Sequence, residues 1–203
     1  MTKYRLFSII CLLTASGIAH SSLIANGGFE SPNISSGWTY GPDTLDGWQG
    51  DNIEVWASGF NGVASYEGNQ HGELNAHPND GTAWSIHQSF DTTLNELYNI
   101  SFAYSARSND TEAFQFSLVD GTHTIFDKTI DDHVTGQWEY FSDSFWGTGN
   151  EMTLAFTSIT PFSGTVGNFL DAIEVVSVPE PGMILLLGAG LVGLGFVRRR
   201  ARK

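Results

Sequence analysis

The sequence predicts an all-β protein, folded as a jelly-roll β-sandwich, with an apolar segment at each end of the chain. Short strand-like segments recur along the middle of the chain, turn residues separate them, and helical periodicity is confined to the two ends. Many short strands with glycine-containing turns are typical of sandwiches and jelly rolls. About 155 residues lie between the ends, which suits one domain of ordinary size.

The expected strands follow one another at short intervals. In the clearest of them, 98–107, the side chains of Tyr98, Ile100, Phe102 and Tyr104 share one face, and smaller side chains share the other. Alternation with a period of two residues indicates a strand with one buried face. The complete expected series is 53–56, 73–76, 84–90, 98–107, 114–118, 123–130, 137–145, 152–159 and 169–178.

Residues 1–21 have the three-part layout of a signal peptide. Lys3 and Arg5 form a charged start, an apolar stretch follows, and Ala19 and Ser21 are small residues at the two positions that a signal peptidase reads. A buried helix of the domain is the alternative, but the apolar stretch ends in a cleavage-like site and not in a helix cap. We therefore expect signal peptidase to release a domain that spans 22–177.

The other end of the chain, 178–203, combines three features in a fixed order. Pro179, Glu180 and Pro181 precede an uncharged run, 183–197, and a basic cluster closes the chain. As a helix, this run would span about 22 Å, which is short of the roughly 30 Å hydrocarbon core unless the flanks and a thinned bilayer contribute. The terminal basic residues would stay in the cytoplasm, so the domain would lie outside the inner membrane.

This tail resembles the PEP-CTERM sorting signal, and the resemblance covers residues 178–203. The resemblance implies export and recognition by an exosortase, a membrane protease-transpeptidase, with processing near Pro179, Glu180 and Pro181. It further implies a transient inner-membrane anchor, followed by delivery to the cell surface or the extracellular matrix of an exopolysaccharide-producing bacterium. A plain C-terminal membrane anchor is the alternative.

The charge of the chain is unevenly distributed. Between the two ends, Arg107 and Lys128 are the only basic residues, and all 22 acidic residues lie from Glu30 to Glu180. Two basic against 22 acidic residues leave this stretch with a formal charge of −20. Such a surface repels phosphate backbones, so nucleic acid is excluded as a partner. The single cysteine, Cys11, lies in the signal peptide, so the domain would contain no disulfide and no cysteine metal cluster.

Two short motifs begin and end the predicted domain. Residues 26–30 read Asn-Gly-Gly-Phe-Glu, and residues 171–175 read Asp-Ala-Ile-Glu-Val. The pair resembles the opening and closing segments of the galactose-binding-like jelly rolls found in many carbohydrate-binding modules. The stretch from 53 to 90 is also similar to domains associated with plant cell walls.

The jelly-roll resemblance implies a structural calcium ion where the first and last strands meet. Glu30 and Asp171 occupy the acidic positions of the two motifs, and calcium takes six to eight oxygen ligands from carboxylates and carbonyls. The alternative is that Glu30 merely follows a turn and Asp171 caps a loop.

The tryptophans are the candidates for ligand contact, because an indole can stack on the apolar face of a sugar ring. Trp56 lies in a polar region with little periodicity, and we expect it to bind a neutral glycan with His71 and Asn75 as hydrogen-bonding partners. A neutral sugar is expected because the negative domain would repel acidic polymers. The alternative is that each tryptophan belongs to the core.

Motifs for catalysis are missing from the sequence. It contains no G-x-S-x-G elbow, no H-E-x-x-H zinc motif and no cysteine outside the signal peptide. A glycosidase pair among Glu54, Glu67 and Glu73 is the one catalytic arrangement left open. The sequence therefore predicts a non-enzymatic exported protein that binds or organises extracellular polysaccharide. The alternatives are a purely structural matrix protein without a specific ligand and a polysaccharide hydrolase.

Overall fold

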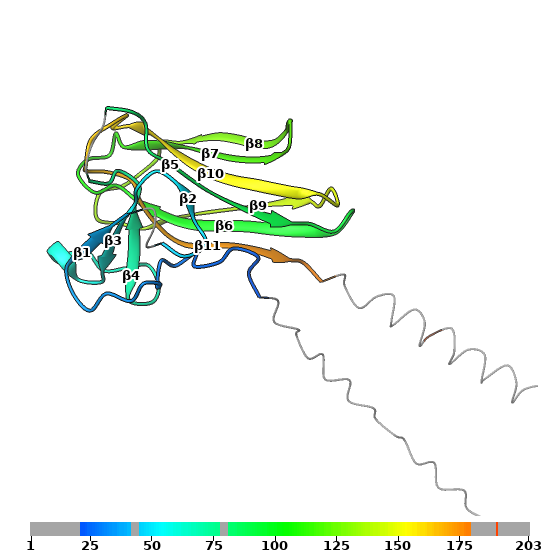
Figure 1. Cartoon of the computed structure of the whole chain (residues 1–203), viewed down its shortest axis with the longest axis horizontal. Coiled ribbons are helices and arrows are strands. Elements are labelled where there is room, and N and C mark those ends of the chain that lie inside the picture. The colour runs from blue at the N-terminus through cyan, green and yellow to red at the C-terminus, as the bar shows by residue number, and fades with distance from the viewer. Residues whose placement is uncertain (1–20, 42–44, 78–80, 180–189, 191–203) are drawn as a thin grey trace, which may run out of the picture.

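Two antiparallel β-sheets lie face to face and confirm the all-β sandwich that the sequence predicts (Figure 1). The computed structural model describes residues 21–41, 45–77, 81–179 and 190. The six-stranded sheet contains, in spatial order, β1 (Trp38–Tyr40), β3 (Glu54–Ala57), β4 (Gln70–Glu73), β11 (Phe169–Ser177), β6 (Leu97–Ser105) and β9 (Glu139–Trp146). The five-stranded sheet contains β2 (Gln49–Gly50), β5 (Ser85–Asp91), β10 (Glu151–Thr160), β7 (Ala113–Asp120) and β8 (His123–Ile130). Every pairing between these strands is antiparallel.

The observed strands match the predicted series closely, with two exceptions. The short strands β1 and β2 were not predicted, because two or three residues are too few to show an alternating pattern. The strand expected at 73–76 instead occupies 70–73, where it pairs with both β3 and β11. All four of its side chains are buried, so no alternation marks it in the sequence.

The core lies between the sheets and is rich in aromatic rings. On β6, the predicted inward face is confirmed, since Tyr98, Ile100, Phe102 and Tyr104 are all buried. The Phe102 ring makes edge contacts with Phe116 and Phe156, at centroid distances of 5.1 Å in both cases. Edge-to-face packing of this kind is the preferred arrangement for aromatic pairs in a core.

The opening motif packs against the closing strand, as the resemblance implies. The segment does not itself form a strand, but the backbone of Ile173 donates to the carbonyl of Gly27 at 3.1 Å. A Cβ atom on Gly27 would lie 1.9 Å from the Ile173 oxygen, so only glycine fits there. Asn26 then turns the chain by bonding Ser31 in both directions, and Phe29 stacks on Trp48 in the core.

One open side of the sandwich is joined by an ion pair between the two edge strands. Lys128 on β8 donates to Asp143 on β9 at 2.8 Å, and its ammonium lies 4.9 Å from the centroid of the Phe141 ring. A charged lysine on an edge strand also discourages further strand pairing.

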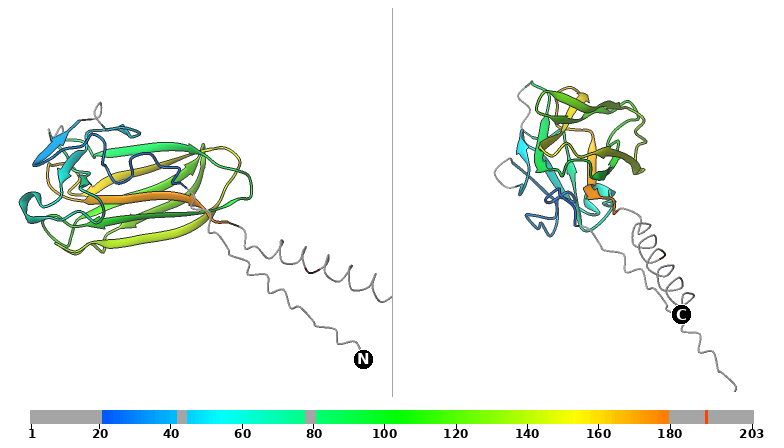
Figure 2. Two further views of the ribbon diagram at one scale, coloured as in Figure 1. Left: turned by 90° about the horizontal axis from the view of Figure 1, so that it is seen from below. Right: turned by 90° about the vertical axis from the view of Figure 1, so that its right-hand side faces the viewer.

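The two ends of the described sandwich lie on the same side of the molecule (Figure 2). The backbone of Leu23 donates to Val175 at 2.7 Å, and that of Val178 donates to Leu97 at 2.8 Å. The short strands β1, β3 and β4 lie toward the opposite end (Figure 1). The molecule therefore has an exit end, where the chain enters and leaves the sandwich, and a far end.

Candidate functional site

At the far end, the outer face of the six-stranded sheet carries a row of aromatic and acidic side chains and one histidine. The antiparallel registers of β1, β3 and β4 align the residues of this row across the strands. Side chains two residues apart on a strand share a face. The aligned pairs are Trp38 with Trp56, Tyr40 with Glu54, Trp56 with His71, and Glu54 with Glu73.

The three predicted ligand-binding residues are buried, Trp56 and His71 within this row and Asn75 just after β4. Trp56 is 2% exposed, and His71 and Asn75 are fully buried. The expectation that the Trp56 ring is an exposed stacking platform is therefore wrong. Several polar residues of the surrounding sequence instead bond to partners far along the chain: Gln70 to Phe29, Glu73 to Arg107 and Asn75 to Pro161.

The partners of these buried side chains are specific. The Trp56 indole nitrogen donates to Glu54 at 3.0 Å. Nδ1 of His71 lies 3.0 Å from the Ser65 hydroxyl, while its Nε2 has no hydrogen-bond partner. Burial lowers the pKa of the His71 imidazole to about 4, so the ring is neutral at physiological pH.

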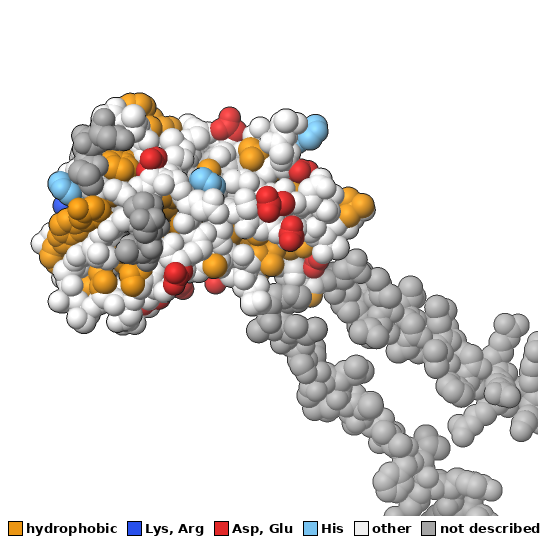
Figure 3. Space-filling view, in the orientation of Figure 1, with side chains coloured by type: hydrophobic (Ala, Val, Ile, Leu, Met, Phe, Trp, Pro, Cys, Tyr) orange, Lys and Arg blue, Asp and Glu red, His pale blue; other side chains and the backbone are white. Residues whose placement is uncertain are grey.

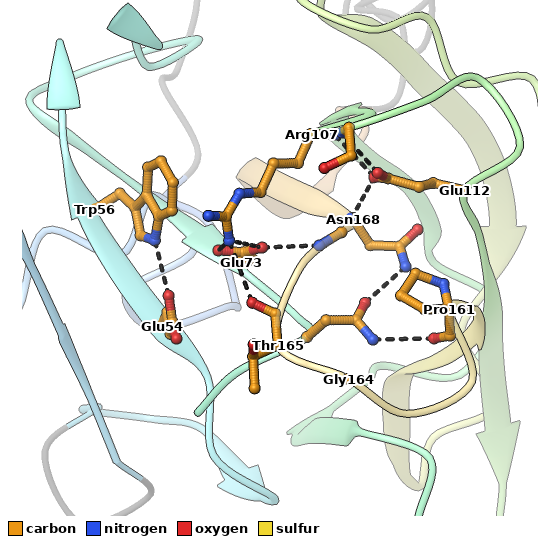
Figure 4. A network of polar contacts seen from close by, with 12 residues as sticks. Glu54, Trp56, Glu73, Arg107, Glu112, Pro161, Gly164, Thr165 and Asn168 are labelled. Carbon is orange, nitrogen blue, oxygen red and sulfur yellow. Dashed lines mark hydrogen bonds and ion pairs between the residues drawn. The ribbon is translucent and has the colours of Figure 1, made fainter. Parts of the chain in front are cut away.

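Arg107 lies at the centre of the site (Figure 4). Its Nη1 donates to both carboxylate oxygens of Glu73 and to the carbonyl of Thr165, and its guanidinium carbon lies 4.5 Å from the centroid of the Trp56 ring. Glu73 also accepts the backbone N–H of Gly167 at 2.8 Å. These contacts fix the guanidinium over the indole.

A second carboxylate anchors the loop that carries Arg107. Glu112 is 1% exposed and accepts backbone N–H groups from Arg107, Ser108 and Asn168 (Figure 4). The Asn168 side chain in turn donates to Asn75 at 2.8 Å. The predicted glycan contact Asn75 is thus a structural link between loops at the far end.

Two pockets meet at Arg107. The first, of about 210 Å³, is lined by Trp38, Glu54, Trp56, Phe60, Asn61, His77, Arg107, Thr165 and Val166. The second, of about 280 Å³, is lined by Gly62, Val63, Ala64, Ser105, Ala106, Arg107, Thr135, Gly136, Trp138 and Phe169. Arg107 belongs to both linings, so the two pockets adjoin at this residue, and we call the pair the Arg107 groove.

Exposed aromatic side chains flank the Arg107 groove on both sides. Trp38 and Tyr40 are stacked with ring centroids 5.7 Å apart, and they are 44% and 42% exposed. On the other side, Tyr66 stacks on Tyr140 at 6.0 Å, and both also are about half exposed, at 47% and 52%. Trp138, which lines the second pocket, contacts Tyr66 edge-on at 6.2 Å. Figure 3 shows hydrophobic side chains gathered on the surface of the far end.

The sequence placed Trp38 among the candidate tryptophans but did not single it out, and it did not point to the flanking tyrosines. Trp38 and Tyr40 alternate as strand residues do, but their strand is only three residues long. Tyr66 lies in a loop and Tyr140 on an edge strand, and only the fold brings them together. The signal that could have found Arg107 is its position as one of two basic residues in an acidic domain.

The two predicted calcium ligands are brought together by the fold. Glu30 accepts the backbone N–H groups of Asn69 and Gln70, and the fully buried Asp171 accepts those of Tyr66 and Glu67. A Cβ atom on Gly28 would lie 3.2 Å from Oε1 of Glu67, 3.7 Å from Oδ1 of Asp171 and 3.9 Å from Cγ of Glu30. The carboxylates of Glu67 and Asp171 and the methylene chain of Glu30 thus lie around Gly28.

Two carboxyl groups of this cluster have raised pKa values. Burial, followed by the charge of Glu67, raises the pKa of Asp171 to about 7, although three backbone N–H groups oppose the rise. Burial and the neighbouring Glu174 and Glu30 also raise the pKa of Glu67. Within the described residues, no group of three or more His, Cys, Asp or Glu has the arrangement of a metal site. A calcium site made from Glu30, Asp171 and backbone carbonyls would need only two carboxylates.

The predicted terminal signals fall largely outside the described part of the chain. The signal peptide, 1–21, lies outside it except for its last residue, as do Glu180 and Pro181 of the sorting motif and nearly all of the run 183–197. Pro179 is described and follows β11. Among the described residues, no helix has the length and apolar character needed to cross a membrane.

Comparison with known families identifies the C-terminal segment. The PEP-CTERM protein-sorting motif matches residues 177–201. The chain therefore carries this motif, which indicates export, a membrane-anchoring sorting signal and processing by an exosortase. Among curated proteins, none matches the sequence.

Solved structures with a similar fold include proteins that act on or bind sugars. An arabinose-bound α-L-arabinofuranosidase matches with a TM-score of 0.50 and 10% identity, over 78% of this chain and 26% of that chain. The enzymatically active domain of bacteriophage CBA120 tailspike protein 4 matches with a TM-score of 0.48 and 13% identity, over 77% and 21% of the two chains. The CBM22-1 xylan-binding domain from Paenibacillus barcinonensis matches with a TM-score of 0.42 and 17% identity, over 80% and 98%. The chain thus spans about a quarter or less of the two larger proteins, and at these identities the likeness shows the fold alone.

Proposed function

We propose that this exported protein binds a neutral polysaccharide in the Arg107 groove and acts without catalysis at the cell surface or in the extracellular matrix. The observation that carries the proposal is the placement of two stacked, half-exposed aromatic pairs, Trp38 with Tyr40 and Tyr66 with Tyr140, beside two adjoining pockets. Rigid aromatic faces offer apolar contact to sugar rings, and the polar groups between them can orient the hydroxyls.

The polar groups of the groove favour an uncharged ligand. Arg107 is already neutralised by Glu73, and Glu54 adds a further carboxylate to the wall of the first pocket. An acidic polymer would therefore meet a site of net negative charge, and the acidic domain as a whole would repel it. Asn61, His77 and Thr165 are the lining residues that offer uncharged hydrogen-bonding groups.

A hydrolase is the competing function, because Glu54 and Glu73 lie side by side on β3 and β4. Paired carboxylates are the machinery of most glycosidases. Glu73 is unsuited to that role, because both of its oxygens accept from Arg107 and it is fully buried. We therefore propose a binding role, and a reducing-sugar assay on the polymers that bind would reveal any hydrolysis.

We also propose a structural calcium ion held by Glu30 and Asp171. Glu67 repels both Glu30 and Asp171, and an oxygen-ligated cation would relieve this repulsion and tie the opening motif to β11. In this proposal calcium stabilises the fold and takes no part in contacting the sugar.

The binding proposal is tested by affinity measurements on the full chain in detergent, with soluble xylan, arabinan, galactan and β-glucan as probes. Trp38→Ala and Tyr140→Ala each remove an exposed ring from one flank, and each should weaken binding by about tenfold or more, as loss of one stacking contact of 1–3 kcal/mol does. Trp146→Ala is the matched control, since that indole is 63% exposed but lies at the exit end.

The outcomes separate the alternatives. Unchanged binding in both flank variants, with circular dichroism showing an intact fold, would place the ligand elsewhere. Binding of none of a broad panel of glycans by the parent chain would favour the purely structural matrix protein.

A further inference from the structure

Two large apolar side chains stand exposed at the exit end of the sandwich. Leu94 and Trp146 are each 63% exposed, more than any other large hydrophobic residue in the described part of the chain. Leu94 lies in the loop before β6, and Trp146 is the last residue of β9. Neither position contributes to the core, so their apolar character has no explanation within the sandwich.

Hydrogen bonds hold these two side chains beside the point where the chain leaves the fold. The backbone of Asn95 donates to Gly147 at 2.8 Å, and that of Gly147 donates to Glu96 at 2.8 Å. Trp146 is paired in register with Leu97, and the carbonyl of Leu97 accepts the N–H of Val178. The loop of Leu94, the end of β9 and the last residue before the Pro-Glu-Pro motif are therefore one connected unit.

The chain length after this point limits how far the unit can lie from a membrane. Four residues, 179–182, separate Val178 from the apolar run 183–197. Five residue steps of covalent chain span at most about 18 Å. When the sorting signal is anchored in the membrane, Val178 must lie near the lipid headgroups. Leu94 and Trp146, which the backbone hydrogen bonds hold beside Val178, must then lie there too.

We propose that Leu94 and Trp146 form a membrane-contact surface that rests on the lipid interface while the sorting signal is anchored. Tryptophan is enriched at the headgroup level of bilayers, and leucine adds apolar area that can enter the boundary with the acyl chains. Figure 3 shows hydrophobic side chains at the end of the sandwich from which the terminal segments leave. The inference rests on the membrane-anchoring motif and is independent of glycan binding.

The charges around this surface determine which lipids it prefers. Glu96 lies two residues after Leu94 in the same loop. Asp91 on β5 and Glu151 on β10 face each other where those strands reach the exit end. These carboxylates repel anionic headgroups over about one Debye length. The contact should therefore be closer on zwitterionic phosphatidylcholine than on bilayers that contain phosphatidylglycerol.

The contact produces a docked orientation of the domain. Resting the exit end on the bilayer would hold the Pro-Glu-Pro motif at a constant depth, where a membrane-embedded protease could reach it. It would also direct the Arg107 groove, at the far end, away from the lipid. Strand β11 has nine residues, which corresponds to a separation of about 30 Å along the sandwich.

The test uses the full chain with Cys11→Ser, reconstituted into phosphatidylcholine vesicles and recovered by flotation. A polarity-sensitive fluorophore is attached to a single cysteine introduced as Leu94→Cys or, in a matched control, as Phe162→Cys. Phe162 is 60% exposed but lies between β10 and β11 at the far end. Headgroup-attached nitroxide lipids should quench the label at position 94 at least about threefold more than the label at position 162.

Further variants sharpen the result. Trp146→Ser in the Leu94→Cys chain should reduce quenching by about half or more, because Trp146 is the one of the two proposed apolar anchors that this labelled chain still has. Equal quenching at positions 94 and 162 in floated protein would overturn the proposal while leaving the anchor intact. A chain that fails to float is not anchored in the bilayer, and this result would overturn the proposal because the proposal assumes the anchor. Neither result would bear on glycan binding at the Arg107 groove.

Discussion

Arg107 donates hydrogen bonds to both carboxylate oxygens of Glu73: its Nη1 lies 2.6 Å from Oε1 and 2.7 Å from Oε2. The Glu73 side chain is fully buried, whereas that of Arg107 is 24% exposed. Burial raises the pKa of the Glu73 carboxyl, and the arginine opposes that rise. The two partners are therefore unequal, because only one of them could be rehydrated if the other were removed.

Removing the arginine should be more destabilising than neutralising the carboxylate. Arg107→Met leaves a buried acid without its partner and should lower the free energy of unfolding by about 3–5 kcal/mol. Glu73→Gln retains an acceptor for Gly167 and should lower it by less than about 2 kcal/mol. Urea unfolding at pH 7 measures both, and the double variant should recover part of the loss caused by Arg107→Met. Equal losses in the two single variants would contradict this asymmetry.

Trp56 should behave as a core residue. Its indole packs edge-on against Phe60 and Phe169, at centroid distances of 4.9 and 5.1 Å. Trp56→Ala should therefore lower the free energy of unfolding by about 3–5 kcal/mol. Trp146→Ala, at an exposed indole, should change it by no more than about 0.5 kcal/mol. Thermal unfolding followed by circular dichroism makes the comparison, and a small effect at Trp56 would show that the site repacks.

His71 should make the protein sensitive to acid. Its folded pKa of about 4 lies below the usual histidine value of 6.5, so the unfolded chain binds a proton first as the pH falls. Stability is therefore lost between about pH 6.5 and pH 4, by roughly 3 kcal/mol in total. His71→Gln cannot titrate in this window. The difference in unfolding free energy between the parent chain and His71→Gln should shrink as the pH is lowered. A constant difference would exclude the His71 imidazole as the cause of the acid sensitivity.

Calcium should stabilise the protein more at alkaline than at mildly acidic pH. Asp171 has a folded pKa of about 7, so calcium must displace a proton from it below that value. The apparent affinity should then fall by up to about tenfold per pH unit below pH 7. At a hundred times the dissociation constant, the ion adds about 2.7 kcal/mol of stability. Melting temperatures with calcium and with chelator, at pH 6 and pH 8, measure the effect.

The metal-free protein supplies the control for the calcium prediction. Because the folded pKa of Asp171 is raised above the usual aspartate value of 3.8, its contribution to stability is complete below about pH 4 and is lost as the pH rises through 7. Asp171→Asn should abolish both this slope and the response to calcium. A calcium response that survives in the variant would mean that the ion binds elsewhere.

The sequence predicted the long strands, but it did not predict which polar residues are buried by hydrogen bonds to distant loops. Strands such as β5 and β10 bury alternate residues, so the pattern was visible without the fold. The stretch 70–75 is polar yet buried, because Gln70 bonds Phe29 and Pro32 while Asn75 bonds Asn168. Those partners lie 38 to 93 positions away, and no local pattern reports them.

The candidate site was predictable only in part. The indole of Trp56, which the sequence singled out, lines the first pocket, but the ring is buried and not exposed as expected. Glu30 and Asp171 were brought together as the motifs implied. The pairing of Tyr66 with Tyr140 depends on a loop folding over an edge strand, which is a tertiary event without a sequence signature.

The scarcity of basic residues between the ends has a consequence for proteolysis. Trypsin cleaves after lysine and arginine, and residues 22–179 offer it only Arg107 and Lys128. Arg107 is held against Glu73 and Trp56, and Lys128 lies within β8 and bonds Asp143. Cleavage at either residue requires the strand or the loop to open first, so the folded domain should survive trypsin at concentrations that digest the unfolded chain. The rate of cleavage at Arg107 and at Lys128 should therefore report how often the loop and the strand that carry them open locally.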